Sequence, residues 1–263
     1  MISSANNAQI KNINKLLKSA KERRETGSFV VEGIKMFEEA RKLGLIRKAF
    51  FSDELHEEWK IVNKEALNEL DYEVVTDKVF REIADTVTPQ GVMGVCSVKS
   101  CTIEEFISKP ACRLLFLEDI RDPGNFGTMI RTAEGTGVTG IVLSKESVDI
   151  YNPKVVRSTM GSIFRVPHVY VDDFPGTIRK AQLEGVIFYA THLNGNQEYD
   201  NVDYAKKAAF IVGNEARGIS DAVAEKADQL IRIPMCGQVE SLNAAVAAAV
   251  MLYEVYRQER REN

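Results

Sequence analysis

The second half of the chain alternates continuous apolar runs with amphipathic stretches, and this pattern restricts the possible folds strongly. Six apolar runs are expected as strands, at residues 113–119, 140–145, 165–171, 186–193, 208–213 and 229–235. Helical stretches are expected to begin at Phe126, Pro153, Pro175, Ser220 and Ser241. Apolar strands separated by helices indicate a parallel α/β sheet covered on both faces. Periodicity alone predicts an unknotted, doubly wound domain.

The first half of the chain has shorter elements and reads as a separate small α/β domain. Four strands are expected, at residues 28–33, 47–52, 72–76 and 91–98, between helical stretches. Pro110 interrupts any helix near residues 108–111, and a new apolar run begins at Arg113. We therefore expect two domains, residues 1–109 and residues 110–263.

The charge of the chain is unevenly distributed. Its 263 residues carry a net charge of −4, but residues 1–50 contain eleven Lys and Arg against five Asp and Glu. Basic residues recur at helical spacing there: Lys11, Lys15, Lys18, Lys21, Arg23 and Arg24. A helix would present them opposite Ile13 and Leu16, either as a solvated surface or as a patch that contacts nucleic-acid phosphates.

Several classes of protein lose their usual signatures. The four Cys form no Cys-x-x-Cys pair, and the three His lack metal-ligand spacing, so we expect no metal site. No Gly-x-Ser-x-Gly, His-Glu-x-x-His or P-loop sequence is present. Gly135, Gly137 and Gly140 match the dinucleotide-binding spacing, but a helix precedes them and a strand follows. That order is the reverse of the fingerprint and indicates a helix stop with a tight turn.

The sequence also predicts a protein without a membrane span. The apolar stretch Ser241–Tyr253 has about 13 residues, fewer than the roughly 18 to 20 that cross a bilayer. The N-terminal residues are too polar for a secretion signal, so the expected location is the cytoplasm.

Three loops follow strands of the predicted parallel sheet, at the edge where ligands bind in such sheets. In the first, Asn125 is a good helix N-cap, and Arg131 on the next helix is either a phosphate-binding or a snorkelling surface residue. In the second, Gly213 allows close approach of a ligand, and Glu215 is a polar contact or a partner of a helix dipole. In the third, Ser241 is expected to cap a helix rich in Ala.

Taken together, these loops resemble motifs of the SpoU (TrmH-type) RNA ribose 2′-O-methyltransferases of the SPOUT superfamily. The motifs are NFGTMIRTA, FIVGNEARGIS and IPMCGQVESLNAAVAAA, within residues 113–258. The N-terminal stretch is similar to the small ribosomal-protein-like substrate-binding domain often found before this catalytic domain.

The resemblance implies a fold and a site. The C-terminal domain would contain a deep trefoil knot, bind S-adenosylmethionine without a metal, and work as a homodimer. It implies that Gly213, Ile233 and Leu242 line the cofactor, with Met235 and Thr191 as neighbours. It assigns Arg131 to activation of the ribose hydroxyl, and the organisation of substrate and cofactor to Asn125, Glu215, Ser241 and Asn243.

The resemblance leaves the RNA and one chemical step open. We expect rRNA as the substrate, with tRNA, or a non-catalytic RNA- or ribosome-binding protein of the same fold, as alternatives. A nucleotide-dependent oxidoreductase is a more distant one. Because arginine stays protonated in proteins, Arg131 either loses its proton transiently or stabilises charge while another group accepts the proton.

Overall fold

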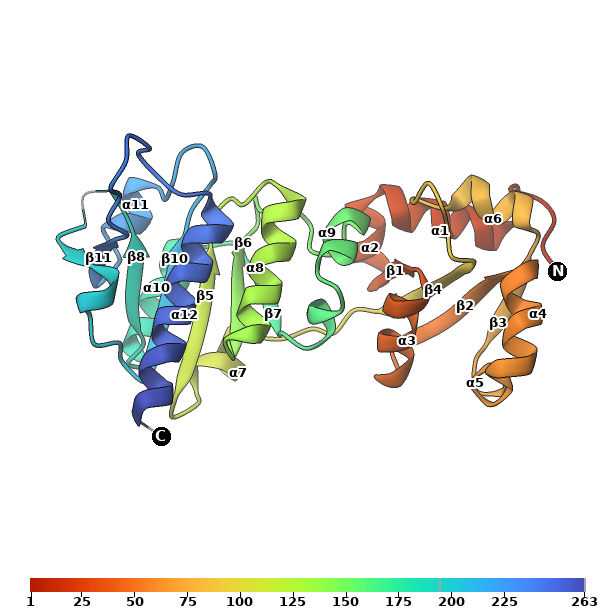
Figure 1. Cartoon of the computed structure of the whole chain (residues 1–263), viewed down its shortest axis with the longest axis horizontal. Helices are drawn as coiled ribbons and strands as arrows, with labels where there is room; N and C mark the ends of the chain where they lie inside the picture. Colours follow the sequence, from red (N-terminus) through yellow and green to blue (C-terminus); the bar gives the residue numbers. More distant parts are fainter. Residues whose placement is uncertain (194, 263) are drawn as a thin grey trace. The chain divides into compact units, whose positions relative to one another are not determined.

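The computed structural model describes residues 1–193 and 195–262, and the chain forms two compact units (Figure 1). The first consists of Met1–Lys99 and Asp149–Phe164, and the second contains Ser100–Val148 and the chain from Arg165 onward. Within the described residues, no helix is long and apolar enough to cross a membrane.

The first unit is built on a mixed four-stranded sheet. Its strands are β1 (Ser28–Glu32), β2 (Ile46–Ser52), β3 (Tyr72–Val75) and β4 (Val92–Ser97), in the order β1-β4-β2-β3. Strand β4 is antiparallel to β1 and β2, whereas β2 and β3 are parallel. The four predicted strands are therefore present.

Helices cover both faces of this sheet (Figure 1). They are α1 (Ala8–Lys18), α2 (Ala20–Thr26), α3 (Ile34–Lys42), α4 (Asp53–Val62), α5 (Lys64–Asn68), α6 (Asp77–Ile83) and α9 (Pro153–Ser158). On one face, α1 and α6 bury Ile13 and Phe80 against Phe50 of β2. On the other, α3 and α4 bury Phe37 and Trp59 against the sheet. Each helix thus hides one apolar stripe, as amphipathic surface helices do.

The second unit contains a seven-stranded, all-parallel sheet, which confirms the predicted α/β class. Its strands are β5 (Cys112–Leu117), β6 (Gly140–Ser144), β7 (His168–Val171), β8 (Ile187–Thr191), β9 (Gln197–Glu198), β10 (Lys207–Val212) and β11 (Gln229–Arg232). The order is β7-β6-β5-β10-β8-β11-β9, and every pairing is parallel. The strand order reverses between β5 and β10, so the loops after these two strands lie side by side.

Helices also cover both faces of the parallel sheet (Figure 1). They are α7 (Ile103–Ile107), α8 (Pro123–Gly135), α10 (Phe174–Leu183), α11 (Asp221–Ala224) and α12 (Ala244–Glu262). Helices α7, α10 and α11 pack on the face that carries Leu114 and Phe116. Helices α8 and α12 pack against each other, and α12 also contacts β10. Both faces of the strands are buried, which explains their continuous apolar sequences.

The division between the units differs from the expected junction at residues 109 and 110. It falls between Lys99 and Ser100, because Phe106 and Ile107 of α7 belong to the core of the second unit. Helix α7 itself was not expected. The segment Asp149–Phe164, although it follows β6, belongs to the first unit.

The segment Asp149–Phe164 completes the core of the first unit. Helix α9 packs on β1, and the rings of Phe29 and Tyr151 have centroids 4.3 Å apart. Oδ2 of Asp149 accepts a hydrogen bond from Nε of Arg23 and forms an ion pair with Nη2, each at 2.7 Å. The sequence pattern could not reveal this arrangement because the partners are far apart in the chain.

Candidate active site

The three motif loops lie at one edge of the parallel sheet. The first and second follow β5 and β10, the neighbouring strands at which the strand order reverses, and the third follows β11. Because all the strands are parallel, their carboxyl ends meet at this edge, where ligands of open α/β sheets bind. The predicted clustering of the three loops is therefore found.

A cavity of about 710 Å³ opens beside the second and third loops. Its volume lies in the range of roughly 300–1,000 Å³ that is typical of small-molecule sites. All five residues predicted to surround a cofactor line it: Thr191, Gly213, Ile233, Met235 and Leu242. Glu215 and Ser241 line it as well. The cavity thus brings together apolar side chains from two motif loops with polar and charged side chains.

Gly213 is required by the packing of its own loop. A Cβ atom at this position would lie 2.2 Å from the backbone carbon of Gly218 and 2.2 Å from the backbone nitrogen of Ile219. The sequence suggested that a missing side chain makes room for a ligand. In the structure, the chain itself fills that space, and Gly213 lines the cavity through its backbone.

Asn125 does not cap helix α8. The cap is Asp122, whose Oδ1 accepts a hydrogen bond of 2.7 Å from the Asn125 backbone N–H, and Pro123 occupies the first turn. The helix therefore begins three residues earlier than the expected Phe126. The Asn125 side chain is left to make contacts outside its own helix.

Those contacts link Asn125 to the other two loops. Its Nδ2 donates to Oε1 of Glu215 at 3.4 Å, and its Oδ1 accepts from Nδ2 of Asn243 at 2.9 Å. Three of the five predicted catalytic residues, each from a different motif, thus form one chain of hydrogen bonds.

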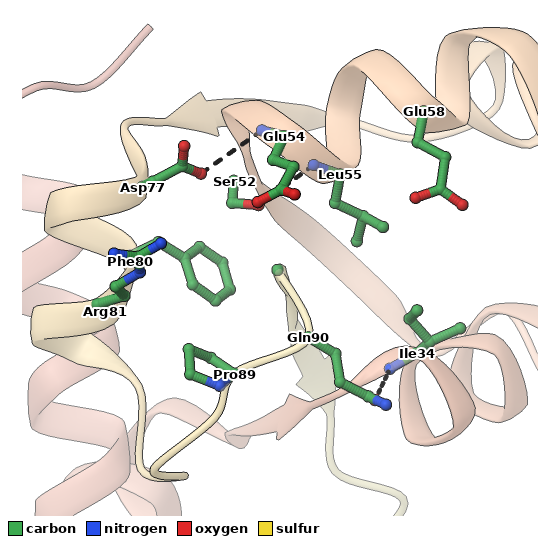
Figure 2. A pocket seen from close by; sticks show the side chains of 11 residues that line it. Ile34, Ser52, Glu54, Leu55, Glu58, Asp77, Phe80, Arg81, Pro89 and Gln90 are labelled. Carbon is green, nitrogen blue, oxygen red and sulfur yellow. Dashed lines mark hydrogen bonds between the residues drawn. The ribbon is translucent and has the colours of Figure 1, made fainter.

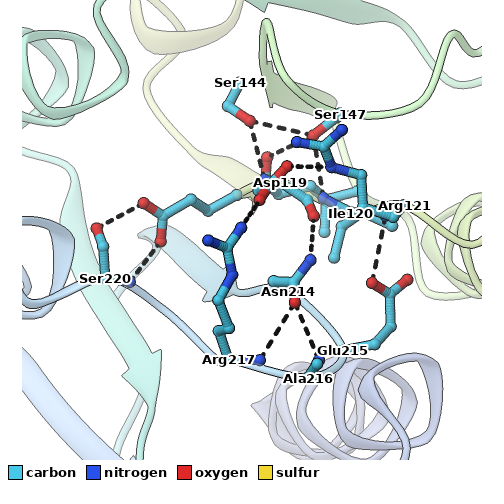
Figure 3. Close-up of polar contacts among 12 residues, drawn as sticks. Asp119, Ile120, Arg121, Ser144, Ser147, Asn214, Glu215, Ala216, Arg217 and Ser220 are labelled. Carbon is cyan, nitrogen blue, oxygen red and sulfur yellow. Dashed lines mark hydrogen bonds and ion pairs between the residues drawn. The ribbon is translucent and has the colours of Figure 1, made fainter.

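Glu215 lies in a loop and not in the helical turn considered for it. Its carboxylate accepts the backbone N–H of Arg121 at 3.2 Å (Figure 3). It also accepts the backbone N–H of Asp122 at 3.0 Å. The carboxylate therefore ties the second motif loop to the turn that precedes α8.

Asn243, and not Ser241, caps helix α12. Its Oδ1 accepts hydrogen bonds from the backbone N–H groups of Ala245 and Val246, at 2.9 and 3.3 Å. The helix begins at Ala244, so Ser241 precedes it and lies exposed on the wall of the cavity. A cap leaves one side of the Asn243 amide available for Asn125.

Arg131 stands apart from the hydrogen-bonded set. It lies on an exposed stripe of α8 with Thr128 and Gly135, six residues beyond Asn125 and therefore roughly 9 Å further along the helix axis. Within residues 1–193 and 195–262 its guanidinium has no hydrogen-bond or ion-pair partner. It does not line the cavity. Its donors are therefore available to a ligand that reaches across α8.

Sequence reasoning missed a second polar network behind these residues (Figure 3). Asn214 donates from Nδ2 to the Asp119 carbonyl at 2.8 Å, and its Oδ1 accepts from the backbone of Ala216 and Arg217. Glu118 accepts from the backbone and hydroxyl of Ser220 at 2.8 and 2.6 Å. The available signal was a polar residue close to the end of each of two buried strands, Glu118 directly after β5 and Asn214 two residues after β10.

The basic residues near the N-terminus separate into two groups. The predicted single helix is two helices, because Ser19 is extended and its side chain caps α2. Five of the six residues are exposed: Lys11, Lys15, Lys18, Lys21 and Arg24. Arg23 is only 4% exposed and also donates to the Leu16 carbonyl at 2.5 Å, so it is not part of this basic surface. The extended Ser19 turns Arg23 inward toward Asp149.

A second cavity, of about 320 Å³, lies in the first unit (Figure 2). Phe80 and Leu55 contribute apolar side chains to its wall, and Gln90 accepts the Ile34 backbone N–H at 2.9 Å through Oε1. None of the predicted site residues lines it. The cavity of the second unit, which predicted site residues do line, is therefore the candidate site.

The glycines that match the dinucleotide-binding spacing lie at the end of a helix, in a turn and at the start of a strand. Gly135 ends α8, Gly137 has a φ of +72°, and Gly140 opens β6 beneath Phe106. This confirms the interpretation as a helix stop and tight turn. In the described part of the chain, no group of three or more His, Cys, Asp or Glu is arranged to hold a metal ion.

The profile of the SpoU rRNA Methylase family matches residues 113–253, which include all three motif loops. The chain belongs to the SpoU rRNA methylase family. A profile described as an MRM3-like substrate binding domain matches residues 7–94, within the first unit.

Relatives of known sequence and structure resemble this chain over nearly its whole length. A Bacillus subtilis protein named 23S rRNA (guanosine(2553)-2′-O)-methyltransferase RlmP is 34% identical, over 97% of this chain and 98% of the relative. The crystal structure of an AdoMet-bound rRNA methyltransferase from Sinorhizobium meliloti is 34% identical with a TM-score of 0.85, covering 98% and 97% of the two chains. The AdoMet complex of the SpoU methyltransferase AviRb from Streptomyces viridochromogenes is 27% identical with a TM-score of 0.86, covering 97% and 98%.

Proposed function

We propose that this protein transfers a methyl group from S-adenosylmethionine to a ribose 2′-hydroxyl of rRNA. The observation that carries the proposal is the cavity at the carboxyl edge of the parallel sheet, with the hydrogen-bonded residues Asn125, Glu215 and Asn243 beside it. Membership of the SpoU family and the name of the Bacillus subtilis relative support the reaction and the class of RNA.

The residues around the cavity suit S-adenosylmethionine. Ile233, Met235 and Leu242 offer apolar contact, and Gly213 offers backbone groups at the end of β10. Small-molecule sites combine apolar walls with polar groups that fix the orientation of the ligand, and this cavity offers both. Bound there, S-adenosylmethionine supplies an electrophilic methyl group on a sulfonium. Two homologous structures hold AdoMet, which supports this occupant.

The polar residues prepare the protein for the ribose. Asn125, Glu215 and Asn243 hold the three motif loops in fixed relation, and Ser241 on the cavity wall can accept or donate a hydrogen bond. Positioning of two reactants in this way supplies a large part of a rate enhancement.

Arg131 acts as an electrostatic stabiliser in this proposal. Arginine stays protonated in proteins, and the exposed Arg131 guanidinium has no acidic partner in the described residues that would occupy its donors. A fixed positive charge can anchor an RNA phosphate or stabilise negative charge that develops on the attacking oxygen. Of the two roles open from sequence, the exposed setting favours this one.

The proposed enzyme is a homodimer that uses the outer face of α8 and α12. Val246 and Tyr253 on α12 are 47% and 53% exposed, and the Tyr253 hydroxyl lies 3.4 Å from where a Cβ of Gly135 would be. Large exposed apolar side chains beside a glycine suit close packing of a second copy. Sedimentation of the wild type against Tyr253→Glu tests the dimer.

The deep trefoil knot and the RNA contact of the first unit are part of the proposal. Family membership supports the knot. The match to a substrate binding domain and the exposed lysines of α1 support an rRNA contact there. Such contact predicts an affinity that falls with salt, by about 0.7 to 0.9 in the logarithmic slope per phosphate contact. A location in the cytoplasm, where rRNA is modified, accords with this substrate.

Labelling tests the reaction directly. Protein incubated with methyl-labelled S-adenosylmethionine and total RNA from a strain lacking the gene should label rRNA, and mapping should place the label on a ribose 2′-oxygen. Label on a base contradicts the reaction, and label on tRNA contradicts the RNA class. Absence of S-adenosylmethionine binding in calorimetry would support a non-catalytic RNA-binding protein instead.

A further inference from the structure

Asp119 holds an unusual backbone conformation directly after strand β5. Its φ is +53°, in the left-handed region that few residues other than Gly, Asn and Asp adopt readily. Its backbone N–H donates to Ser144 Oγ at 2.9 Å, and its carbonyl accepts from Asn214 at 2.8 Å (Figure 3). The backbone of Asp119 is thus held by hydrogen bonds on both its N–H and its carbonyl.

The Asp119 carboxylate pairs with two arginines from different loops (Figure 3). Nε of Arg121 contacts Oδ1, and Nη2 of Arg217 contacts Oδ2. The side chain of Asp119 is 15% exposed, whereas those of Arg121 and Arg217 are 60% and 74% exposed. One fixed carboxylate therefore holds two guanidinium groups that face solvent.

Stability does not account for this arrangement. Exposed ion pairs contribute only about 0 to 1 kcal/mol, and holding two long side chains on one carboxylate costs conformational entropy. The three side chains together retain one positive charge. A guanidinium has five N–H donors, so contact with one carboxylate oxygen leaves most of them available. The arrangement is better suited to present prepared donors to an anion.

The position of the two arginines indicates which anion. Arg217 lines the proposed cofactor cavity, and the Arg121 backbone N–H is bound by Glu215, another lining residue. An RNA whose ribose enters this site brings a phosphate on each side of that ribose. The planar arginine fork matches the geometry of phosphate oxygens and can bind them in pairs.

We propose that Arg121 and Arg217 form a phosphate clamp for the RNA strand that flanks the target ribose, and that Asp119 is the positioning residue that orients both. The inference rests on the proposed function, because it assumes that RNA is the substrate. It adds residues outside the hydrogen-bonded set of Asn125, Glu215 and Asn243.

Charge-removing substitutions test the clamp. Arg121→Gln, Arg217→Gln and the double variant are compared with Arg179→Gln, which removes an exposed arginine on α10. We expect each clamp variant to raise KM for rRNA at least threefold, with kcat within about twofold of wild type. Because Arg121 does not line the cavity, Arg121→Gln should also leave the Kd for S-adenosylmethionine unchanged. The slope of log K against log salt should become shallower by about 0.7 to 0.9 per arginine removed. The control should match wild type in all four quantities.

Conservative substitutions separate charge from orientation. Arg217→Lys keeps the charge but not the fork, so it should restore the salt slope while recovering only part of KM. Asp119→Asn tolerates the positive φ and keeps both arginines, so the salt slope should remain while kcat/KM falls severalfold. Wild-type KM and salt slope in the double variant would overturn the clamp, and wild-type kcat/KM in Asp119→Asn would overturn the positioning role.

Failure of the clamp is distinguishable from failure of the proposed function. If the wild type transfers no methyl group to ribose, the proposed function is wrong. The equilibrium salt slope for RNA binding still decides whether Arg121 and Arg217 contact phosphate.

Discussion

The side-chain amide of Asn243 donates a hydrogen bond of 2.9 Å to Oδ1 of Asn125, across a sequence separation of 118 residues. Asn125 in turn donates to Glu215 of the second motif loop. Because the same Asn243 side chain caps α12, the start of that helix and the relation of the motif loops depend on one residue.

Two substitutions at position 243 should separate these roles. Asn243→Ala removes the cap and should lower the free energy of unfolding by about 1 kcal/mol, with loss of methyl transfer. Asn243→Ser keeps a capping oxygen but is too short to reach Asn125, so stability should remain while activity falls. Urea denaturation and single-turnover methyl transfer measure the two effects. Full activity in Asn243→Ser would show that the link to Asn125 is dispensable.

Arg131→Ala should abolish most activity without affecting the fold. Its guanidinium is exposed, so we expect an unchanged melting temperature and unchanged S-adenosylmethionine binding. Loss of one stabilising group at a reacting oxygen typically lowers kcat by about 10² to 10³. Single-turnover transfer at saturating RNA checks this, and a variant within twofold of wild type would remove Arg131 from the chemistry.

Gly213→Ala should damage the cofactor cavity. The new Cβ would lie 2.2 Å from backbone atoms of Gly218 and Ile219, which cannot move independently of their loop. We expect a loss of about 1 to 3 kcal/mol in unfolding free energy and at least tenfold weaker S-adenosylmethionine binding. Gly237→Ala is the matched control, because no atom lies within 4 Å of its added Cβ. Equal behaviour of the two variants would contradict the packing argument.

Arg23 and Lys15 should behave differently although both belong to the basic N-terminal sequence. Arg23→Ala leaves Asp149 without its buried partner and should cost about 3 to 5 kcal/mol of stability. Lys15→Ala is exposed and should change stability by less than about 0.5 kcal/mol while weakening RNA binding. Chemical denaturation and filter binding measure these effects. A stable Arg23→Ala variant with weakened RNA binding would return Arg23 to the basic surface.

Glu254 on α12 should contribute a pH-dependent part of stability. Hydrogen bonds from the Arg257 side chain lower the pKa of Glu254 below its ordinary value of 4.5. Because the pKa is lower in the folded protein, this stabilisation is fully present above pH 4.5 and is lost as the pH falls through the folded value. Glu254→Gln should therefore lose less stability than wild type on acidification below pH 4.5. Circular dichroism measures unfolding of both proteins as the pH is lowered. An equal loss of stability in wild type and Glu254→Gln would contradict this prediction.

Six of the seven strands of the parallel sheet, and the clustering of the motif loops at one edge, were predictable from local sequence. Strands β5, β6 and β10 are apolar throughout because both faces of the sheet are covered, and the motif loops follow strand ends. The five residues predicted around a cofactor do line one cavity. Continuous apolar runs and polar loop residues are local patterns, so they can be read without tertiary contacts.

The helix caps and the buried arginine required information that local patterns do not hold. Asn125 and Ser241 are both good capping types. In the structure, however, Asp122 caps α8, which begins at Pro123, and Asn243 caps α12. Arg23 resembles its exposed neighbours in sequence, but its buried charge is paired with Asp149, 126 residues away. Tertiary structure determines which of several suitable residues caps a helix. It also determines which distant charges form a pair.

The assignment of Asp149–Phe164 to the first unit has a consequence for protein synthesis. Residues 1–99 leave the ribosome early, but the partner of Arg23 and the aromatic neighbours of Phe29 emerge only after strand β6 has been made. The first unit therefore cannot reach its final packing until translation has passed Phe164. Folding of the first unit is therefore completed only after Ser100–Val148 of the second unit has been synthesised. A ribosome stalled before Phe164 carries a first unit whose core lacks the side chains of this segment.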